Sequence, residues 1–198
     1  MIAIINYEAG NLASVSNALS RLDVPHTITN KEKELDEASG IIFPGVGHAR
    51  PAMESLQANG LDHWLKNTSK PVLGICLGMQ LLYDSSEEGD ASGLGIIPGR
   101  LRKFDASLEK VPHMGWNTFS DMRDHPLLEG FSTDHYFYYV HSYYAPVNDF
   151  TIASCRYITN FASVVAKDNF MGVQFHPEKS GKAGAQLLRQ FLQYALTS

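Results

Sequence analysis

Short apolar runs alternate with helical patterns through the first half of the chain, and this alternation limits the fold more than any other sequence feature. Strand-like runs occur at IAIINY (2–7), HTIT (26–29), GIIFPG (40–45) and PVLGI (71–75). Helical periods lie between them at 11–22, with Asn11 as the N-cap, and at 51–68, with a break at Gly60. Strands that alternate with helices predict a parallel sheet covered by helices on both faces.

The second half of the chain has a different pattern. Strand-like runs separated by short turns occur at 99–104, 136–145, 151–157, 161–168 and 170–175, and an amphipathic helical pattern closes the chain at 181–196. These strands predict antiparallel additions to the sheet. Because no internal repeat or linker interrupts the pattern, we expect residues 1–198 to form a single α/β domain.

Composition excludes several classes of protein. The net charge is −5 and no Lys/Arg run occurs, which argues against nucleic acid or an anionic membrane as a partner. The two cysteines are far apart and fit no metal-ligand spacing, so we expect no metal, no cofactor and a reduced, cytoplasmic chain. The apolar start is short and lacks basic residues, and no apolar run is as long as a membrane span.

The segment KPVLGICLGMQLLYD (70–84) places Cys76 between Gly74 and Gly78, where a strand pattern changes to a helix pattern. This Gly-x-Cys-x-Gly sequence is the thiol version of a nucleophile elbow, whose sharp turn leaves no room for a Cβ on either side. We expect the following helix, predicted to begin at CLGMQLLYD, to favour the thiolate, and the N–H of Leu77 to face a developing oxyanion. The alternative is a buried structural cysteine, as we expect for Cys155.

A proton carrier for the thiol is found in QFHPEKSG. His176 and Glu178 are two residues apart at the end of a strand pattern, so an extended backbone would place them on the same face. A carboxylate beside an imidazole fixes the tautomer and stabilises the imidazolium. The alternative is a surface turn.

The loop Pro44-Gly45-Val46-Gly47 follows the third strand, and parallel sheets bind ligands at the carboxyl ends of their strands. The loop lacks the residues of a phosphate loop and the spacing of a dinucleotide fingerprint. Exposed N–H groups beside a nucleophilic cysteine fit the second half of an oxyanion hole. The alternative is a tight turn.

Three of these motifs together resemble the class I (triad-type) glutamine amidotransferases: PGVG (44–47), GICLGMQLL (74–82) and GVQFHPE (172–178). The similarity extends along the chain from the first strand to the last helix. The resemblance implies that family's flavodoxin-like fold and the hydrolysis of glutamine by a Cys76–His176–Glu178 triad, with the ammonia passed to a synthase partner. It also implies an oxyanion hole at Val46, Gly47 and Leu77. Residues implied to hold the glutamine substrate are Gln80, His141, Ser142 and Tyr143.

Other segments narrow the resemblance. Most family members carry Pro-Gly-Gly in the oxyanion loop, whereas this chain has PGVG. That loop and four other segments are similar to one branch of the family. The four segments are NYEAGNLASVSNAL (6–19), SSEEGDASGLGIIPGR (85–100), KVPHMGWN (110–117) and YFYYVHSYY (136–144). In that branch the glutaminase forms a heterodimer with a (β/α)8-barrel cyclase, which makes imidazole glycerol phosphate and AICAR in histidine biosynthesis.

A partner implies a contact surface near the thiol. Pro112, Met114 and Trp116 form an apolar and aromatic set typical of an interface centre, and Lys179 is a candidate for an ion pair across it. Core packing is the alternative, above all for Trp116.

Three other functions remain open. A glutaminase subunit of another synthase, such as anthranilate synthase, is disfavoured by PGVG. A free-standing cysteine hydrolase, such as a peptidase or γ-glutamyl hydrolase, would be fully active without a partner. A non-catalytic binding module would lack a triad member.

Overall fold

The computed structural model describes residues 1–7 and 10–197. Within them, nine strands form one mixed sheet in the order β2-β1-β3-β4-β13-β12-β11-β8-β9. Its parallel strands are β1 (Ile2–Ile5), β2 (His26–Thr29), β3 (Gly40–Gly45), β4 (Val72–Cys76) and β13 (Phe170–Val173). Antiparallel strands extend it, namely β8 (His113–Met122), β9 (Tyr136–His141), β11 (Thr151–Arg156) and β12 (Asn160–Lys167).

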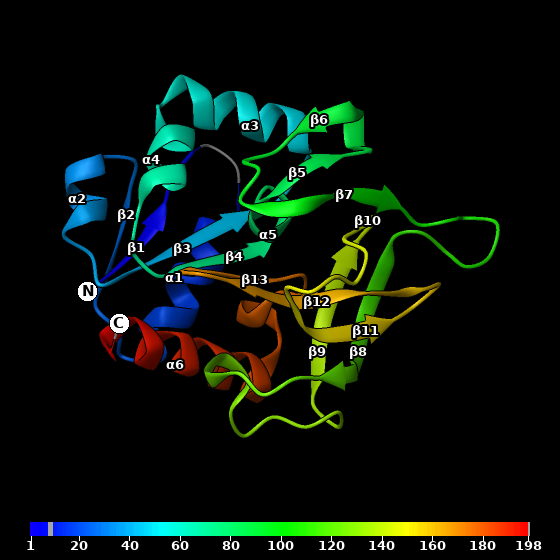
Figure 1. The fold of residues 1–198 in the computed structure, drawn as a ribbon. Coiled ribbons are helices and arrows are strands. Elements are labelled where there is room, and N and C mark those ends of the chain that lie inside the picture. The colour runs from blue at the N-terminus through cyan, green and yellow to red at the C-terminus, as the bar shows by residue number, and fades with distance from the viewer. Residues whose placement is uncertain (8–9, 198) are drawn as a thin grey trace.

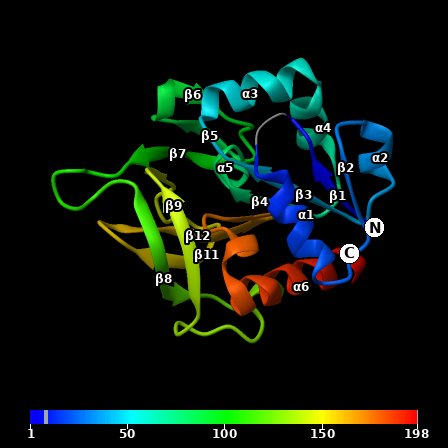
Figure 2. The ribbon, with the colours of Figure 1, turned by 180° about the vertical axis from the view of Figure 1, so that it is seen from behind.

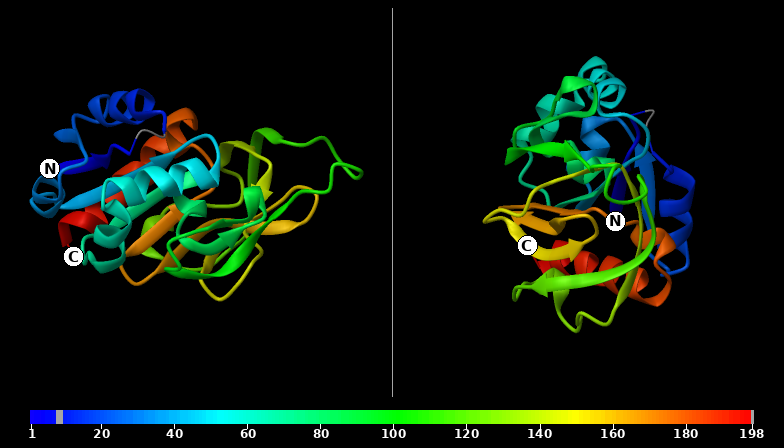
Figure 3. Two further views of the ribbon diagram at one scale, coloured as in Figure 1. Left: turned by 90° about the horizontal axis from the view of Figure 1, so that it is seen from above. Right: turned by 90° about the vertical axis from the view of Figure 1, so that its right-hand side faces the viewer.

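Helices cover both faces of the parallel half, as the sequence predicts (Figure 1, Figure 2 and Figure 3). The helices are α1 (Leu12–Ser20), α2 (Glu32–Asp36), α3 (Ala49–Ala58), α4 (Leu61–Asn67), α5 (Leu77–Gln80) and α6 (Gly181–Thr197). Short 3₁₀ turns add η1 (Glu88–Asp90), η2 (Pro126–Leu128) and η3 (Pro177–Lys179). Figure 1 shows α3 and α4 on one side of the sheet and α6 on the other.

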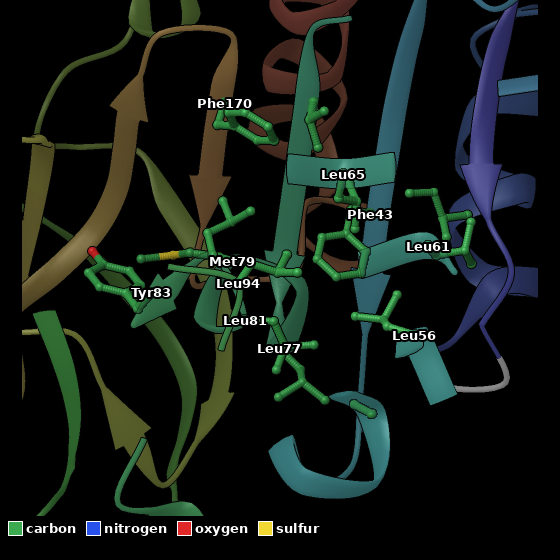
Figure 4. Close-up of a cluster of buried hydrophobic side chains, with 14 of the residues drawn as sticks. Phe43, Leu56, Leu61, Leu65, Leu77, Met79, Leu81, Tyr83, Leu94 and Phe170 are labelled. Carbon is green, nitrogen blue, oxygen red and sulfur yellow. The ribbon is translucent and has the colours of Figure 1, made fainter. Parts of the chain in front are cut away.

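Two apolar cores lie on the two faces of the sheet. One contains side chains of α3, α4 and the α5 turn, with Phe43 of β3 and Met79 among them (Figure 4). The other contains Leu19 of α1 and Phe191 of α6. Burial on both faces explains why β1, β3, β4 and β13 have nearly continuous apolar sequences, whereas the edge strand β2 does not.

Local signals set the helix boundaries. The Asn11 side chain accepts a hydrogen bond from the Ser14 N–H at 3.3 Å and so caps α1. Gly60 adopts a left-handed conformation, φ 71°, between α3 and α4, where the sequence predicts a break.

The sequence predicts a helix that begins at CLGMQLLYD, and this prediction is wrong beyond the first turn. α5 ends at Gln80, and β5 (Tyr83–Ser86) follows almost at once. The Leu81 carbonyl accepts from the Leu94 N–H at 2.8 Å, and the Leu82 carbonyl accepts from Ile97 at 2.9 Å. Pairing with a distant segment therefore outweighs the local helical period.

The segment 99–104 also departs from its prediction as an addition to the main sheet. It lies in β7 (Ile97–Lys103), within a second sheet ordered β10-β7-β5-β6 among the described residues. The other small strands of that sheet are β6 (Ala91–Ser92) and β10 (Tyr143–Tyr144). This sheet stands beside the carboxyl ends of β3 and β4 (Figure 1). No helix in residues 1–7 and 10–197 is both long and apolar enough to span a membrane.

Candidate active site

Cys76 lies at the corner between β4 and α5 with φ 53°, a strained conformation for a residue with a side chain. A Cβ on Gly78 would lie 1.8 Å from the Phe43 carbonyl oxygen, and a Cβ on Gly74 would lie 2.7 Å from the Met79 nitrogen. Both contacts are with backbone atoms, which have no room to move away. The close approach of the α5 turn to β3 and β4 therefore requires both glycines, as the elbow pattern predicts.

His176 and Glu178 meet through Nδ1 and Oε1 at 2.8 Å, and their side chains are 3% and 1% exposed. The extended geometry predicted for this pair is wrong, because Pro177–Lys179 forms a 3₁₀ turn that folds the carboxylate back onto the ring. The His176 N–H donates to the Tyr138 carbonyl at 2.9 Å and anchors the turn to β9. The pair is thus rigid and shielded from water.

The electrostatics of His176 follow from its two neighbours. Burial alone would lower the pKa of His176, but interactions with the Cys76 sulfur and the Glu178 carboxylate outweigh burial and raise the pKa to about 10. With Nδ1 on Glu178, the ring presents Nε2 to the cavity that Cys76 lines. Nε2 has no hydrogen-bond partner among the described residues and is available to a reacting group.

A cavity of about 320 Å³ contains these groups. Its walls bring together most of the residues predicted from the sequence, namely Val46, Gly47, Cys76, Leu77, Gln80, Pro112, His141, Ser142, Tyr143 and His176. A cavity of about 560 Å³ lies elsewhere, between Met122 and Phe131, and contains neither the thiol nor His176. The smaller cavity is therefore the candidate active site.

Two backbone segments in this cavity can face an oxyanion. Leu77 is the first residue of α5, so its N–H has no carbonyl partner within the helix. Gly47 has φ 100°, and a Cβ added to it would have no atom within 4 Å, so the loop is open there. Gly45 is instead tightly packed, because a Cβ added to it would lie 2.7 Å from both the Gly78 nitrogen and the Tyr7 hydroxyl. The Tyr7 hydroxyl also donates to the Pro44 carbonyl at 2.7 Å.

The predicted substrate-binding side chains are joined by hydrogen bonds. Gln80 Nε2 donates to the Tyr143 carbonyl at 3.0 Å and to Gln174 Oε1 at 2.9 Å, which leaves the Gln80 oxygen to face a ligand. His141 Nδ1 bonds the same carbonyl at 2.8 Å. Burial is the main reason that the pKa of His141 falls to about 3, so the ring is neutral at physiological pH.

Sequence reasoning missed three residues of this region. Glu88 and His48 line the cavity, where Glu88 Oε1 lies 3.1 Å from His48 Nδ1 and Oε2 accepts from the Ala49 N–H at 2.8 Å. The acidic SSEEGD segment was the only sequence signal for Glu88. Gln174, behind the thiol, is the third; it stands inside the GVQFHPE motif, but nothing local distinguished it.

The predicted interface residues lie outside the cavity, except Pro112. Met114 and Trp116 project from β8 with 63% and 56% of their surfaces exposed, so Trp116 is not a core residue. Trp116 packs edge-on against Tyr138, and Lys179 Nζ lies 6.0 Å from the centre of the Tyr138 ring. Cys155 is fully buried in β11, as expected for a structural cysteine.

Comparison with known proteins gives consistent matches. A family model for glutamine amidotransferase class-I matches residues 3–194. The imidazole glycerol phosphate synthase subunit HisH of Bacteroides fragilis is 48% identical over 194 residues, covering 97% of this chain and 98% of the relative. The HisH subunit of Staphylococcus aureus is 46% identical over 194 residues, covering 98% of this chain and 97% of the relative.

Solved structures share the fold at low sequence identity. A putative GMP synthase protein from Thermoplasma acidophilum aligns with a TM-score of 0.76 at 19% identity, covering 99% of this chain and 94% of that chain. A glutamine amidotransferase crystal structure also aligns with a TM-score of 0.76, at 16% identity, covering 98% and 99% of the two chains.

Proposed function

The chain belongs to the class I glutamine amidotransferase family, and we infer from its relatives that it is the glutaminase subunit of imidazole glycerol phosphate synthase, in histidine biosynthesis. It hydrolyses glutamine and works with a partner subunit that uses the ammonia. We propose further that residues 1–198 act as one catalytic domain in the cytoplasm.

We assign the chemistry to Cys76, His176 and Glu178. The Cys76 thiolate adds to the amide carbon of glutamine, and the carbon–nitrogen bond then breaks with a proton from His176, releasing ammonia and leaving a glutamyl thioester. Water, losing its proton to His176, attacks the thioester, and the sulfur departs as glutamate forms. Glu178 holds the imidazole in position and stabilises its charged form.

The single observation that carries this proposal is the convergence of a strained elbow cysteine and a buried His–Glu pair on one cavity. The N–H groups of Leu77 and of the Val46–Gly47 segment would hold the negative oxygen of each tetrahedral intermediate.

We propose that substrate is held by neutral polar groups and one carboxylate. In this proposal the amino-acid end of glutamine is held by four residues of the cavity wall. Gln80 binds it through its side-chain oxygen, together with His141, Ser142 and Tyr143. Glu88, which also lines the cavity, supplies a carboxylate for the substrate ammonium. A carboxylate that faces a free ammonium group fits an amino acid rather than the interior of a peptide.

We propose that the partner is a (β/α)8-barrel cyclase. Ammonia is mostly protonated in neutral water and then is no nucleophile, so the two active sites need a sealed route. Met114 and Trp116 are exposed, Lys179 lies over the Tyr138 ring that Trp116 also contacts, and Pro112 lies at the cavity wall. Together they offer a contact surface for the partner.

The test is steady-state glutaminase activity of the chain alone, with the cyclase, and with the cyclase and its nucleotide substrate. We expect a poor enzyme alone, because rotation at the open Gly47 would remove an oxyanion donor, which costs roughly 10²–10³ in rate. Partner binding would then favour the competent loop. Full activity in the isolated chain would favour a free-standing hydrolase instead.

A further inference from the structure

The nucleophilic sulfur has a polar neighbour that the triad does not include. Gln174 is completely buried, and its Nε2 donates a hydrogen bond to the Cys76 sulfur at 3.8 Å. Its backbone N–H donates to the Ser163 carbonyl at 2.8 Å and fixes the residue to β12. Gln174 is not part of the cavity wall, so it approaches the sulfur from the protein side and leaves the cavity side to His176 and substrate.

The orientation of the Gln174 amide follows from its other contact. Gln80 Nε2 lies 3.0 Å from the Tyr143 carbonyl, which only accepts hydrogen bonds, so this atom must be the nitrogen. The same nitrogen lies 2.9 Å from Gln174, whose oxygen must therefore face Gln80. The Gln174 NH₂ group is left to face the sulfur.

The Tyr143 carbonyl is itself held in place by His141, and His141 is held by His113. His141 must carry its proton on Nδ1 to bond that carbonyl at 2.8 Å, so its Nε2 accepts. His113 Nδ1 lies 3.0 Å from that nitrogen and donates to it. Gln80 Nε2 thus donates to two fixed acceptors, the Tyr143 carbonyl and Gln174 Oε1, which gives Gln80 and Gln174 little freedom to rotate.

A second neighbour of the sulfur acts in the opposite sense. The Val140 carbonyl oxygen lies 4.0 Å from Cys76 Sγ, where a protonated thiol can donate to it but a thiolate cannot. Of these two neighbours, only the Gln174 N–H favours the charged sulfur. A hydrogen bond to the charged form of a group lowers the free energy of that form.

We propose that Gln174 is a catalytic hydrogen-bond donor to the Cys76 sulfur, which stabilises the thiolate from the protein side, and that Gln80 is the positioning residue for Gln174. The proposal rests on the glutaminase function proposed above. The N–H would favour the thiolate before attack on the amide carbon, and again when the carbon–sulfur bond of the thioester breaks. Gln174 transfers no proton in either step.

Other titratable groups also surround the sulfur, so the effect of Gln174 must be measured against a constant background. These groups, from the loops and strands packed around Cys76, are Tyr7, His48, Glu88, His141, His176 and Glu178. None of them is altered by a substitution at Gln174.

The test is the rate of Cys76 alkylation by iodoacetamide as a function of pH, with the modified peptide identified by mass spectrometry. Gln174→Met keeps the length of the side chain but removes the donor. We expect the midpoint of the profile to rise by about one pH unit, a tenfold loss of thiolate at a given pH below it. In the complex with the cyclase, kcat should fall about tenfold with little change in the KM for glutamine.

The matched control is Ser163→Ala, which removes a buried hydroxyl bonded to Tyr139 and leaves the sulfur contacts intact. Its alkylation profile should match that of the unaltered chain. An unchanged midpoint in Gln174→Met, or an equal shift in Ser163→Ala, would overturn the proposal. An unreactive Cys76 in the unaltered chain would instead overturn both this proposal and the triad assignment.

A measurement without substitution at Gln174 covers the case in which Gln174→Met does not fold. The side-chain amide of Gln174, observed by ¹⁵N NMR, should shift with pH at the midpoint found for alkylation. That step should be absent in Cys76→Ala. A Gln174 amide signal with the same titration in both proteins would contradict a hydrogen bond to the thiolate.

Discussion

Tyr7→Phe removes one atom, the hydroxyl that donates to the Pro44 carbonyl at 2.7 Å. Both residues are buried, and the hydroxyl also lies against Gly45, at the start of the oxyanion loop. The substitution therefore tests whether the packed end of that loop is held by this single contact.

The expected loss of stability follows from burial. A buried acceptor that loses its donor costs about 1–3 kcal/mol. With a urea slope of about 2 kcal/mol/M, the unfolding midpoint should fall by about 1 M. Gly45 leads directly into Val46 and Gly47, so a loosened Gly45 should also disturb the oxyanion donors. Complete loss of one such donor lowers the rate by roughly 10²–10³, and we expect a smaller loss here, about tenfold in glutaminase kcat in the cyclase complex.

Tyr139→Phe is the matched control. Its hydroxyl is also buried and bonds the Ser163 hydroxyl at 2.6 Å, away from the oxyanion loop. Urea unfolding followed by fluorescence should show a similar loss of stability in both variants, while only Tyr7→Phe should lose activity. Equal kcat values in the two variants would refute the idea that Tyr7 orders the loop.

Three further predictions concern the triad and the partner surface. His176→Ala should reduce glutaminase activity nearly as much as loss of the thiol, and Glu178→Gln should reduce it less, because an amide still holds the ring; steady-state kinetics showing the reverse order would contradict these roles. The raised pKa of His176, about 10, means that its charge stabilises the folded chain fully below its ordinary pKa, and that this contribution is lost as pH rises through about 10. Cys76→Ala removes a neighbour that raises this pKa, so an NMR titration of the ring should give a lower value, and an unchanged value would show that the sulfur does not interact with it. Trp116→Ala should weaken cyclase binding by about 2 kcal/mol in calorimetry, whereas Leu196→Ala, 74% exposed on α6, should leave it unchanged; equal effects would exclude this surface as the interface.

The parallel half of the sheet could be predicted because its signals are local. Continuous apolar strands, the Asn11 cap and the break at Gly60 are all read within a few residues. β8 was not predicted, because His113–Met122 contains Gly, Asn and Asp, which disfavour strands, and its pairing comes from β9 and β11. The early end of α5 has the same origin in distant pairing.

In the candidate active site, too, local features could be predicted from the sequence and contacts between distant segments could not. Cys76 was predicted from its flanking glycines, whose close contacts are set by one tight turn. The contact of His176 with Glu178 was predicted, but through an extended backbone rather than the 3₁₀ turn that forms it. Gln174 could not be found, because its contact with the sulfur joins residues 98 apart in the chain.

The central claim is that Cys76 supplies ammonia to a partner and has no part in the partner's own chemistry. The most direct measurement compares synthesis by the Cys76→Ala complex with glutamine and with added ammonium salt as the nitrogen source. We predict that glutamine-dependent synthesis falls on the order of 10⁴-fold or more while ammonia-dependent synthesis is retained. Glutamine-dependent turnover within about tenfold of the unaltered complex would contradict the assignment of Cys76 as the nucleophile.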